Sequence, residues 1–147
     1  AELRAESYPL QLNGETYEIG AVSMGNPHAI LLVEETKDAP VERLGPLVEH
    51  HARFPRRTNV GFMAVRSRDL IDLRVHERGA GETLACGTGA CAAVVHGRAL
   101  GMLDERVQVR LPGGALVVSW AGNDDTVWMT GPAVKVFDGR IDLDSLS

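Results

Sequence analysis

One cysteine stands where the sequence changes from a flexible loop to a helix. Cys86 is followed by Gly87-Thr88-Gly89 and then by a run of small apolar residues typical of a tightly packed helix. If that helix begins at Gly87, Cys86 is its N-cap residue, where unpaired backbone N–H groups and the positive end of the helix dipole favour an anion. We therefore predict that the pKa of the Cys86 thiol is lowered from its usual value of about 8.5, which makes it a usable base or nucleophile.

The glycines beside Cys86 leave backbone amides bare. A substrate carboxylate could lie against the amides of this segment, close to the sulfur. The alternative is that Cys86 is a small buried residue at a glycine-rich helix cap. We favour the functional interpretation, because a thiol, an anion-binding helix start and a flexible approach loop coincide.

The second cysteine, Cys91, lies five positions further along the same predicted helix. A helix of 3.6 residues per turn points it about 140° away from residue 86, so we interpret it as core packing. Two cysteines at this spacing cannot reach disulfide geometry without breaking the helix. Both are expected to be free thiols, which indicates a reducing compartment, the cytoplasm.

The strand predicted over residues 70–77 leads into the loop before the thiol. Ile71, Leu73 and Val75 alternate with polar residues, which places Glu77 on the apolar side at the end of the strand. A carboxylate aimed inward needs a partner. The alternative is an exposed ion pair between Glu77 and Arg78, worth under about 1 kcal/mol.

The remaining pattern predicts an α/β (α+β) domain in which a curved, mostly antiparallel mixed sheet wraps a central helix over residues 87–100. A helix after Pro40 is expected to hold Pro46 in its first turn. Residues 1–13 are polar and weakly patterned and are interpreted as a connector. The other predicted strands are 17–23, 29–33, 59–66, 107–111, 115–120, 126–130, 133–138 and a last one near Ile141.

Composition excludes several classes of function. The chain has 147 residues, which suits one domain, and a net charge of −5 without a basic block, which argues against nucleic acid. No apolar run approaches the length of a membrane helix. A dinucleotide fingerprint at Gly87-x-Gly89-x-x-Ala92 lacks its acidic partner, and a zinc site from Cys86, Cys91 and His96 fails on spacing. The histidines at 50, 51, 76 and 96 are interpreted as surface or helix-face residues, and Trp120 and Trp128 as core or hairpin packing.

Three ordered motifs resemble the C-terminal half of diaminopimelate epimerase. They are Gly25-Asn26-Pro27-His28, the segment from Arg57 to Met63, and the segment from Glu77 to Thr83 with its continuation from Cys86 to Ala90. The resemblance runs from about Val22 to the end of the chain. It implies one half of a two-domain epimerase fold, with residues 1–13 as the connector from a missing N-terminal half that carries its own catalytic cysteine.

The resemblance also implies an activity. The family interconverts LL- and meso-diaminopimelate by a two-cysteine acid/base mechanism, without pyridoxal phosphate, metal or other cofactor, on the route to lysine and peptidoglycan precursors. This chain would supply one cysteine, be inactive alone, and belong to a cytoplasmic homodimer. Two alternatives stay open: half of a proline-racemase-like enzyme, which shares the Cys-Gly-Thr-Gly element, and a non-catalytic domain that binds amino-acid carboxylates.

The resemblance assigns roles to particular residues. Composition alone would make Asn26, His28 and Asn59 ordinary turn residues. By the resemblance, the catalytic residues are Cys86, with His28 and Glu77 beside it, and the substrate-binding residues are Asn26, Asn59, Glu77, Arg78, Gly87 and Thr88.

Overall fold

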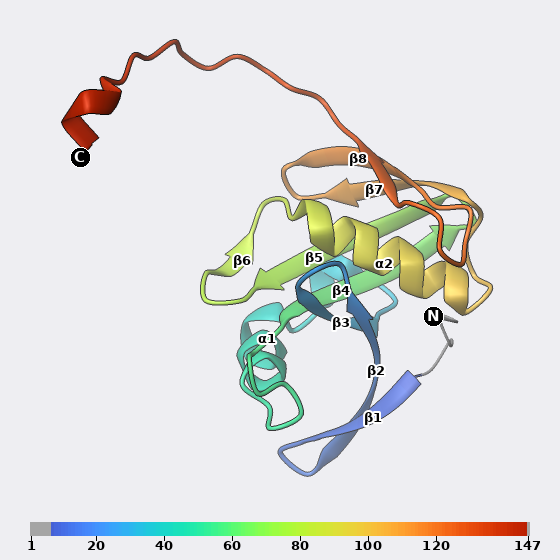
Figure 1. The fold of residues 1–147 in the computed structure, drawn as a ribbon. Helices are drawn as coiled ribbons and strands as arrows, with labels where there is room; N and C mark the ends of the chain where they lie inside the picture. The colour runs from blue at the N-terminus through green and yellow to red at the C-terminus, as the bar shows by residue number, and fades with distance from the viewer. Residues whose placement is uncertain (1–6, 147) are drawn as a thin grey trace.

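Within residues 7–146, a single mixed sheet of nine strands curls around one central helix (Figure 1). The computed structural model describes residues 7–146. The helices are α1 (Val41–Glu49) and α2 (Gly87–Ala99), with two short 3-10 turns, η1 (Thr36–Asp38) and η2 (Leu143–Leu146). The strands are β1 (Ser7–Leu12), β2 (Glu15–Ser23), β3 (Pro27–Leu32), β4 (Asn59–Ser67), β5 (Leu70–Glu77), β6 (Gly81–Thr83), β7 (Arg106–Leu111), β8 (Gly114–Ser119) and β9 (Trp128–Thr130).

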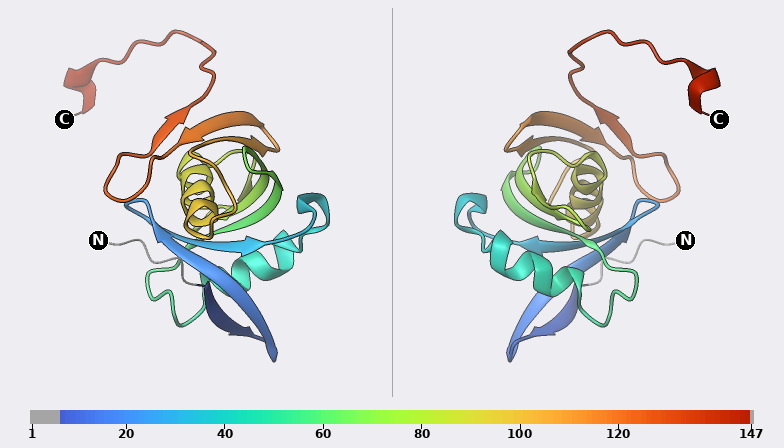
Figure 2. Two further views of the ribbon diagram at one scale, coloured as in Figure 1. Left: turned by 90° about the vertical axis from the view of Figure 1, so that its right-hand side faces the viewer. Right: turned by 90° about the vertical axis from the view of Figure 1, so that its left-hand side faces the viewer.

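The strand order is β1-β2-β3-β4-β5-β7-β8-β9, and β6 pairs with β5. The pairs β3–β4 and β5–β7 are parallel, and every other pair is antiparallel. Seen along α2, the sheet surrounds much of the helix (Figure 2). The predicted curved, mostly antiparallel sheet around a central helix is therefore confirmed.

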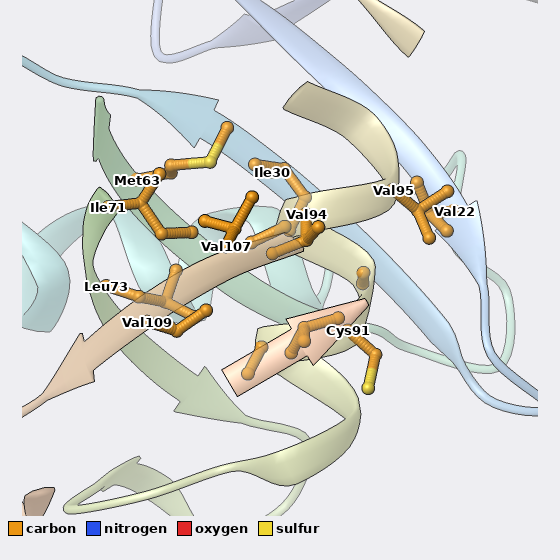
Figure 3. Packing of buried hydrophobic residues seen from close by; sticks show 14 of the residues in the cluster. Val22, Ile30, Met63, Ile71, Leu73, Cys91, Val94, Val95, Val107 and Val109 are labelled. Carbon is orange, nitrogen blue, oxygen red and sulfur yellow. The ribbon is translucent and has the colours of Figure 1, made fainter. Parts of the chain in front are cut away.

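Helix α2 is enclosed because its residues are small and apolar on nearly every side. Its alanines at 90, 92 and 93 and Val94 are fully buried and belong to the same core cluster as Ile71 and Val107. Figure 3 shows Val94 among the strand side chains of this cluster. Backbones approach closely here: a methyl group at Gly20 in β2 would come within 2.2 Å of the His96 ring of α2. No helix among residues 7–146 has the length and apolarity needed to cross a membrane.

A second apolar cluster lies between the sheet and α1. It includes Leu10 and Leu12 of β1, Phe62 of β4, and Val41 and Val48 of α1. The sequence predicted no strand before Tyr17, and this is wrong for residues 7–12. The alternation of Leu10 and Leu12 gives β1 a buried face that fills this cluster. Residues 1–6 of the predicted connector lie outside the described residues.

Three further predictions are wrong. Pro46 lies in the interior of α1, because the helix already begins at Val41. Residues 133–138 and Ile141 form no strand among the described residues, because the segment pairs with nothing and runs away from the sheet (Figure 1). Trp128 is 69% exposed, whereas Trp120 is buried as predicted.

Candidate active site

The predicted site residues gather where four elements meet at one end of the sheet. Strands β3 and β4 are parallel and in register at His28 and Asn59, so both begin at this end. Strand β5 is antiparallel to β4 and ends here at Glu77, and contacts between residues 26 and 88 bring the start of α2 to the same place. The topology therefore brings together residues that lie 62 positions apart in the sequence.

Cys86 is the N-cap residue of α2, as predicted. Its backbone is extended, with φ −138° and ψ 106°, and its carbonyl accepts the first helical hydrogen bond from the Ala90 amide at 3.0 Å. The residue is 8% exposed. A methyl group at Gly89 would come within 3.1 Å of the Cys86 sulfur, so the glycine lets the thiol lie close against the first turn.

The predicted lowering of the Cys86 pKa is wrong. Burial raises the pKa, and the nearby Glu77 carboxylate raises it further. The Gly89 amide and the Thr88 hydroxyl favour the thiolate and lower the pKa, but their effect is smaller. Among residues 7–146, no side-chain hydrogen bond caps α2. Cys86 is therefore mainly a neutral thiol at pH 7.

A row of contacts connects His28 with Cys86. The His28 Nε2 atom lies 3.0 Å from Asn26 Oδ1, and Asn26 Nδ2 donates to Thr88 Oγ1 at 3.3 Å. The Thr88 Oγ1 atom lies 3.8 Å from the Cys86 sulfur. Burial lowers the pKa of His28 to about 4, against the opposing effect of Glu77, and Arg78 lowers it further. The imidazole is therefore neutral near pH 7.

Glu77 is half-buried at the end of β5, and its carboxylate has a partner. The Thr83 hydroxyl donates to its Oε1 atom at 2.6 Å. The guanidinium of Arg78 donates to the Arg56 carbonyl at 3.2 Å, so the alternative of a Glu77–Arg78 ion pair is not needed to explain either side chain.

Two buried side chains hold the backbone that follows Glu77. Asn59 Oδ1 accepts the Arg78 amide at 2.8 Å, while its Nδ2 donates to the Pro27 carbonyl at 3.3 Å. Glu49 Oε1, from the end of α1, accepts the Gly79 amide at 2.7 Å. These two acceptors fix the direction in which the loop leaves β5.

Glu49 and His76 were missed by the sequence analysis. Glu49 Oε2 lies 2.7 Å from His76 Nε2, and both residues are buried. The prediction that His76 is a surface residue is wrong, because α1 covers this face of β5. The available signal was the position of Glu49 next to Val48 on the buried side of an amphipathic helix. The pKa of Glu49 is raised by burial, but hydrogen bonds from His76 and Gly79 more than offset this and lower it overall.

Gly87 and Thr88 supply the amides at the start of α2. The first N–H groups of a helix have no partner within it, so they are available to an anion. Met129 of β9 lies over this turn, since a methyl group at Gly87 would come within 3.0 Å of its sulfur. The chemistry available here is thus a thiol, a neutral imidazole, a carboxylate and a helix start.

A cleft of about 500 Å³ elsewhere on the sheet is a weaker candidate. It is lined by residues including Arg74 and Arg110, but no predicted site residue lines it. Its guanidinium groups are already paired, Arg74 with Glu82 and Arg110 with Asp72, each at 2.6 Å. Residues 7–146 hold no group of three His, Cys, Asp or Glu side chains that could bind a metal ion.

Comparison with known proteins points to one family. The family model described as diaminopimelate epimerase matches residues 20–136. The chain is 66% identical over 144 residues to the diaminopimelate epimerase of Thioalkalivibrio sulfidiphilus, a match covering 97% of this chain and 52% of that protein. It is 62% identical to the diaminopimelate epimerase of Alkalilimnicola ehrlichii, and this match covers 98% of this chain and 52% of that protein. The chain thus spans about half the length of these curated relatives.

Solved structures share the fold at low identity. A hydroxyproline epimerase from Agrobacterium vitis superposes with a TM-score of 0.53 at 17% identity, covering 81% of this chain and 41% of that one. A PhzF-family protein from Enterococcus faecalis superposes with a TM-score of 0.51 at 19% identity, and the match covers 78% of this chain and 41% of that one. At these identities the likeness concerns the fold alone.

Proposed function

Because the chain belongs to the diaminopimelate epimerase family, we propose that it supplies one half of an active site that inverts an α-carbon of diaminopimelate, on the route to lysine and peptidoglycan precursors. The observation that carries the proposal is the Cys86 thiol at the start of α2, with Thr88 and Glu77 beside it. An acid/base group next to bare helix amides suits proton transfer at a carbon that carries a carboxylate.

The proposed reaction is a proton exchange at the α-carbon. One group removes the α-hydrogen as a proton, and the C–H electron pair moves toward the substrate carboxylate. The amides of Gly87 and Thr88 stabilise the negative charge that grows there. A second group on the opposite face returns a proton and so inverts the centre. The raised pKa of Cys86 suits its thiol to deliver that proton, and its thiolate then removes the α-hydrogen in the reverse direction.

The opposing group is proposed to come from outside this chain. Cys91 is buried in the core on the same helix, so it does not face Cys86 across a substrate. The segment after β9 exposes Val134, Val136 and Phe137 at 84%, 87% and 82%. Exposed apolar groups of this kind are typical of a surface that another part of a protein covers. An N-terminal half carrying the second cysteine would fit both observations.

The far end of the substrate is proposed to lie over the residues around Asn59. Asn26 lies at this end of the sheet near buried Asn59, whose amide is already bonded at both ends, and Arg78 is exposed at the end of β5. Arg78 is suited to the distal carboxylate and Glu77 to the distal ammonium group. These contacts distinguish diaminopimelate from proline, which has no second amino-acid group.

The test is exchange of the α-hydrogen of diaminopimelate in D₂O. We expect none with this chain alone, and exchange with inversion when the first half of a close relative is supplied. Cys86→Ala should abolish it, while Cys91→Ala should retain it. Turnover by the isolated chain would refute the half-site proposal.

The same assay separates the alternatives. Exchange with proline that survives Arg78→Ala would favour a proline-racemase-like enzyme. Binding of diaminopimelate without exchange in the reconstituted pair would favour a binding domain. We also propose that the complete protein is a cytoplasmic homodimer. The two unpaired thiols agree with a reducing compartment such as the cytoplasm. Light scattering of the complete protein tests whether it is a dimer.

A further inference from the structure

The hydrogen bonds that connect His28 with Cys86 can run in only two directions. Asn26 occupies the middle, with one amide atom toward His28 and the other toward Thr88. An amide has a donor end and an acceptor end, so its orientation decides which nitrogen of His28 carries the proton. It also decides whether the Thr88 hydroxyl proton is free to point at the sulfur.

The buried Nδ1 atom of His28 distinguishes the two directions. His28 is 1% exposed, and its Nδ1 atom has no hydrogen-bond partner among residues 7–146. If Asn26 donated to His28, the single proton of the neutral imidazole would sit on Nδ1 as a buried, unpaired N–H. If Asn26 instead accepts a hydrogen bond from His28, the proton sits on Nε2, and Nδ1 is an unprotonated acceptor without a donor. Unpaired buried N–H groups are rarer than unpaired buried acceptors, which favours the second arrangement.

We propose that His28, Asn26 and Thr88 form a one-way hydrogen-bond chain whose donors all point toward Cys86. His28 donates from Nε2 to Asn26 Oδ1, Asn26 donates from Nδ2 to Thr88 Oγ1, and the Thr88 hydroxyl donates to the Cys86 sulfur. The contacts of 3.0, 3.3 and 3.8 Å fall in that order. His28 and Asn26 are then positioning residues that act on the thiol through Thr88.

The consequence rests on the proposed function, in which Cys86 alternates between thiol and thiolate. A donor aimed at sulfur stabilises the thiolate and offsets part of the effect of burial. The other titratable or charged groups that act on this row are Glu77 and Arg78 at the end of β5 and the Cys91 thiol within α2. Since Glu77 opposes the thiolate, the Thr88 hydroxyl is the side-chain group that favours it.

The first test is the tautomer of His28, read from ¹⁵N chemical shifts and couplings of the labelled imidazole in the unmodified chain at pH 7. We expect a proton on Nε2 and a bare Nδ1. A proton on Nδ1 would overturn the proposal. No variant is needed, so folding defects cannot obscure the result. Asn26→Leu should remove the preference, giving a mixture of the two tautomers.

The second test is the thiolate fraction of Cys86, followed by its ¹³Cβ shift during a pH titration in a Cys91→Ala background. Thr88→Val removes the hydroxyl and should lower the thiolate fraction at a given pH by roughly threefold to tenfold, the value of one hydrogen bond. Thr88→Ser keeps the hydroxyl and should stay within about twofold of the parent. If Cys86 had the same pKa in the Thr88→Val and Thr88→Ser variants, the proposed hydrogen-bond chain would be refuted. Both tests use the chain without substrate, so their outcome is independent of the exchange assay.

Discussion

Replacing Glu49 with alanine removes the carboxylate that connects α1 with the loop after β5. Two buried donors lose their acceptor, the His76 ring at 2.7 Å and the Gly79 amide at 2.7 Å. A hydrogen bond to a charged group contributes roughly 1.5 kcal/mol or more, so two give about 3 kcal/mol. This agrees with the roughly 3–5 kcal/mol lost when one partner of a buried pair is removed. At about 2–4 °C per kcal/mol, the melting temperature should fall by roughly 6–12 °C at pH 7.

Scanning calorimetry or circular dichroism measures this, with Glu42→Ala as the matched control. Glu42 lies on the same helix but is exposed, so its loss should cost under about 1 kcal/mol. The pKa of Glu49 is lowered in the folded state, so its contribution is present above the unfolded pKa of 4.5 and is lost as pH falls below it. The difference in melting temperature between the parent protein and Glu49→Ala should therefore become smaller below pH 4.5. A Glu49→Ala melting temperature within 2 °C of the parent at pH 7 would contradict this reasoning, given the roughly 6–12 °C expected.

Three further changes test other contacts. Gly20→Ala forces a methyl group against the His96 ring and should cost roughly 1–3 kcal/mol in urea unfolding, part of which His96→Ala in the same chain should restore. Removing residues 131–147 should change the melting temperature by no more than about 2 °C, because residues 131–146 bury no side chain; a larger fall would mean that the tail stabilises the fold. Asp72→Asn breaks two arginine pairs and should cost about 1 kcal/mol at low salt and less at high salt, since one arginine is half exposed; no salt dependence would argue against the pairs.

Much of the fold could be predicted from local pattern. The alternation of Ile71, Leu73 and Val75 predicted the bounds of β5, and the small residues after Cys86 predicted the enclosed helix. Strand β1 was missed because Leu10 and Leu12 alone carry its buried face. The segment 133–138 has a strand-like sequence, but a strand also needs a neighbour to pair with, and residues 7–146 offer none.

The site was harder to predict than the fold. Spacing placed Cys86 at a helix start, but the sign of its pKa shift depends on how far the sheet covers the sulfur, which no local pattern gives. The Glu49–His76 pair joins a helix and a strand 27 positions apart, and the alternation in β5 indicated an exposed His76. His76 is buried only because α1 packs over the face of β5 that carries it.

The enclosure of α2 has a consequence for how the protein can be studied during folding. A short helix rich in glycine and alanine with no polar side has little reason to form in water on its own, so its order depends on the surrounding strands. Both thiols belong to this part of the fold, Cys86 as the N-cap residue of the helix and Cys91 within it, and both are buried in the native state. Pulsed alkylation of the two sulfurs would therefore report separately on fraying of the helix start and on global unfolding, without any added label.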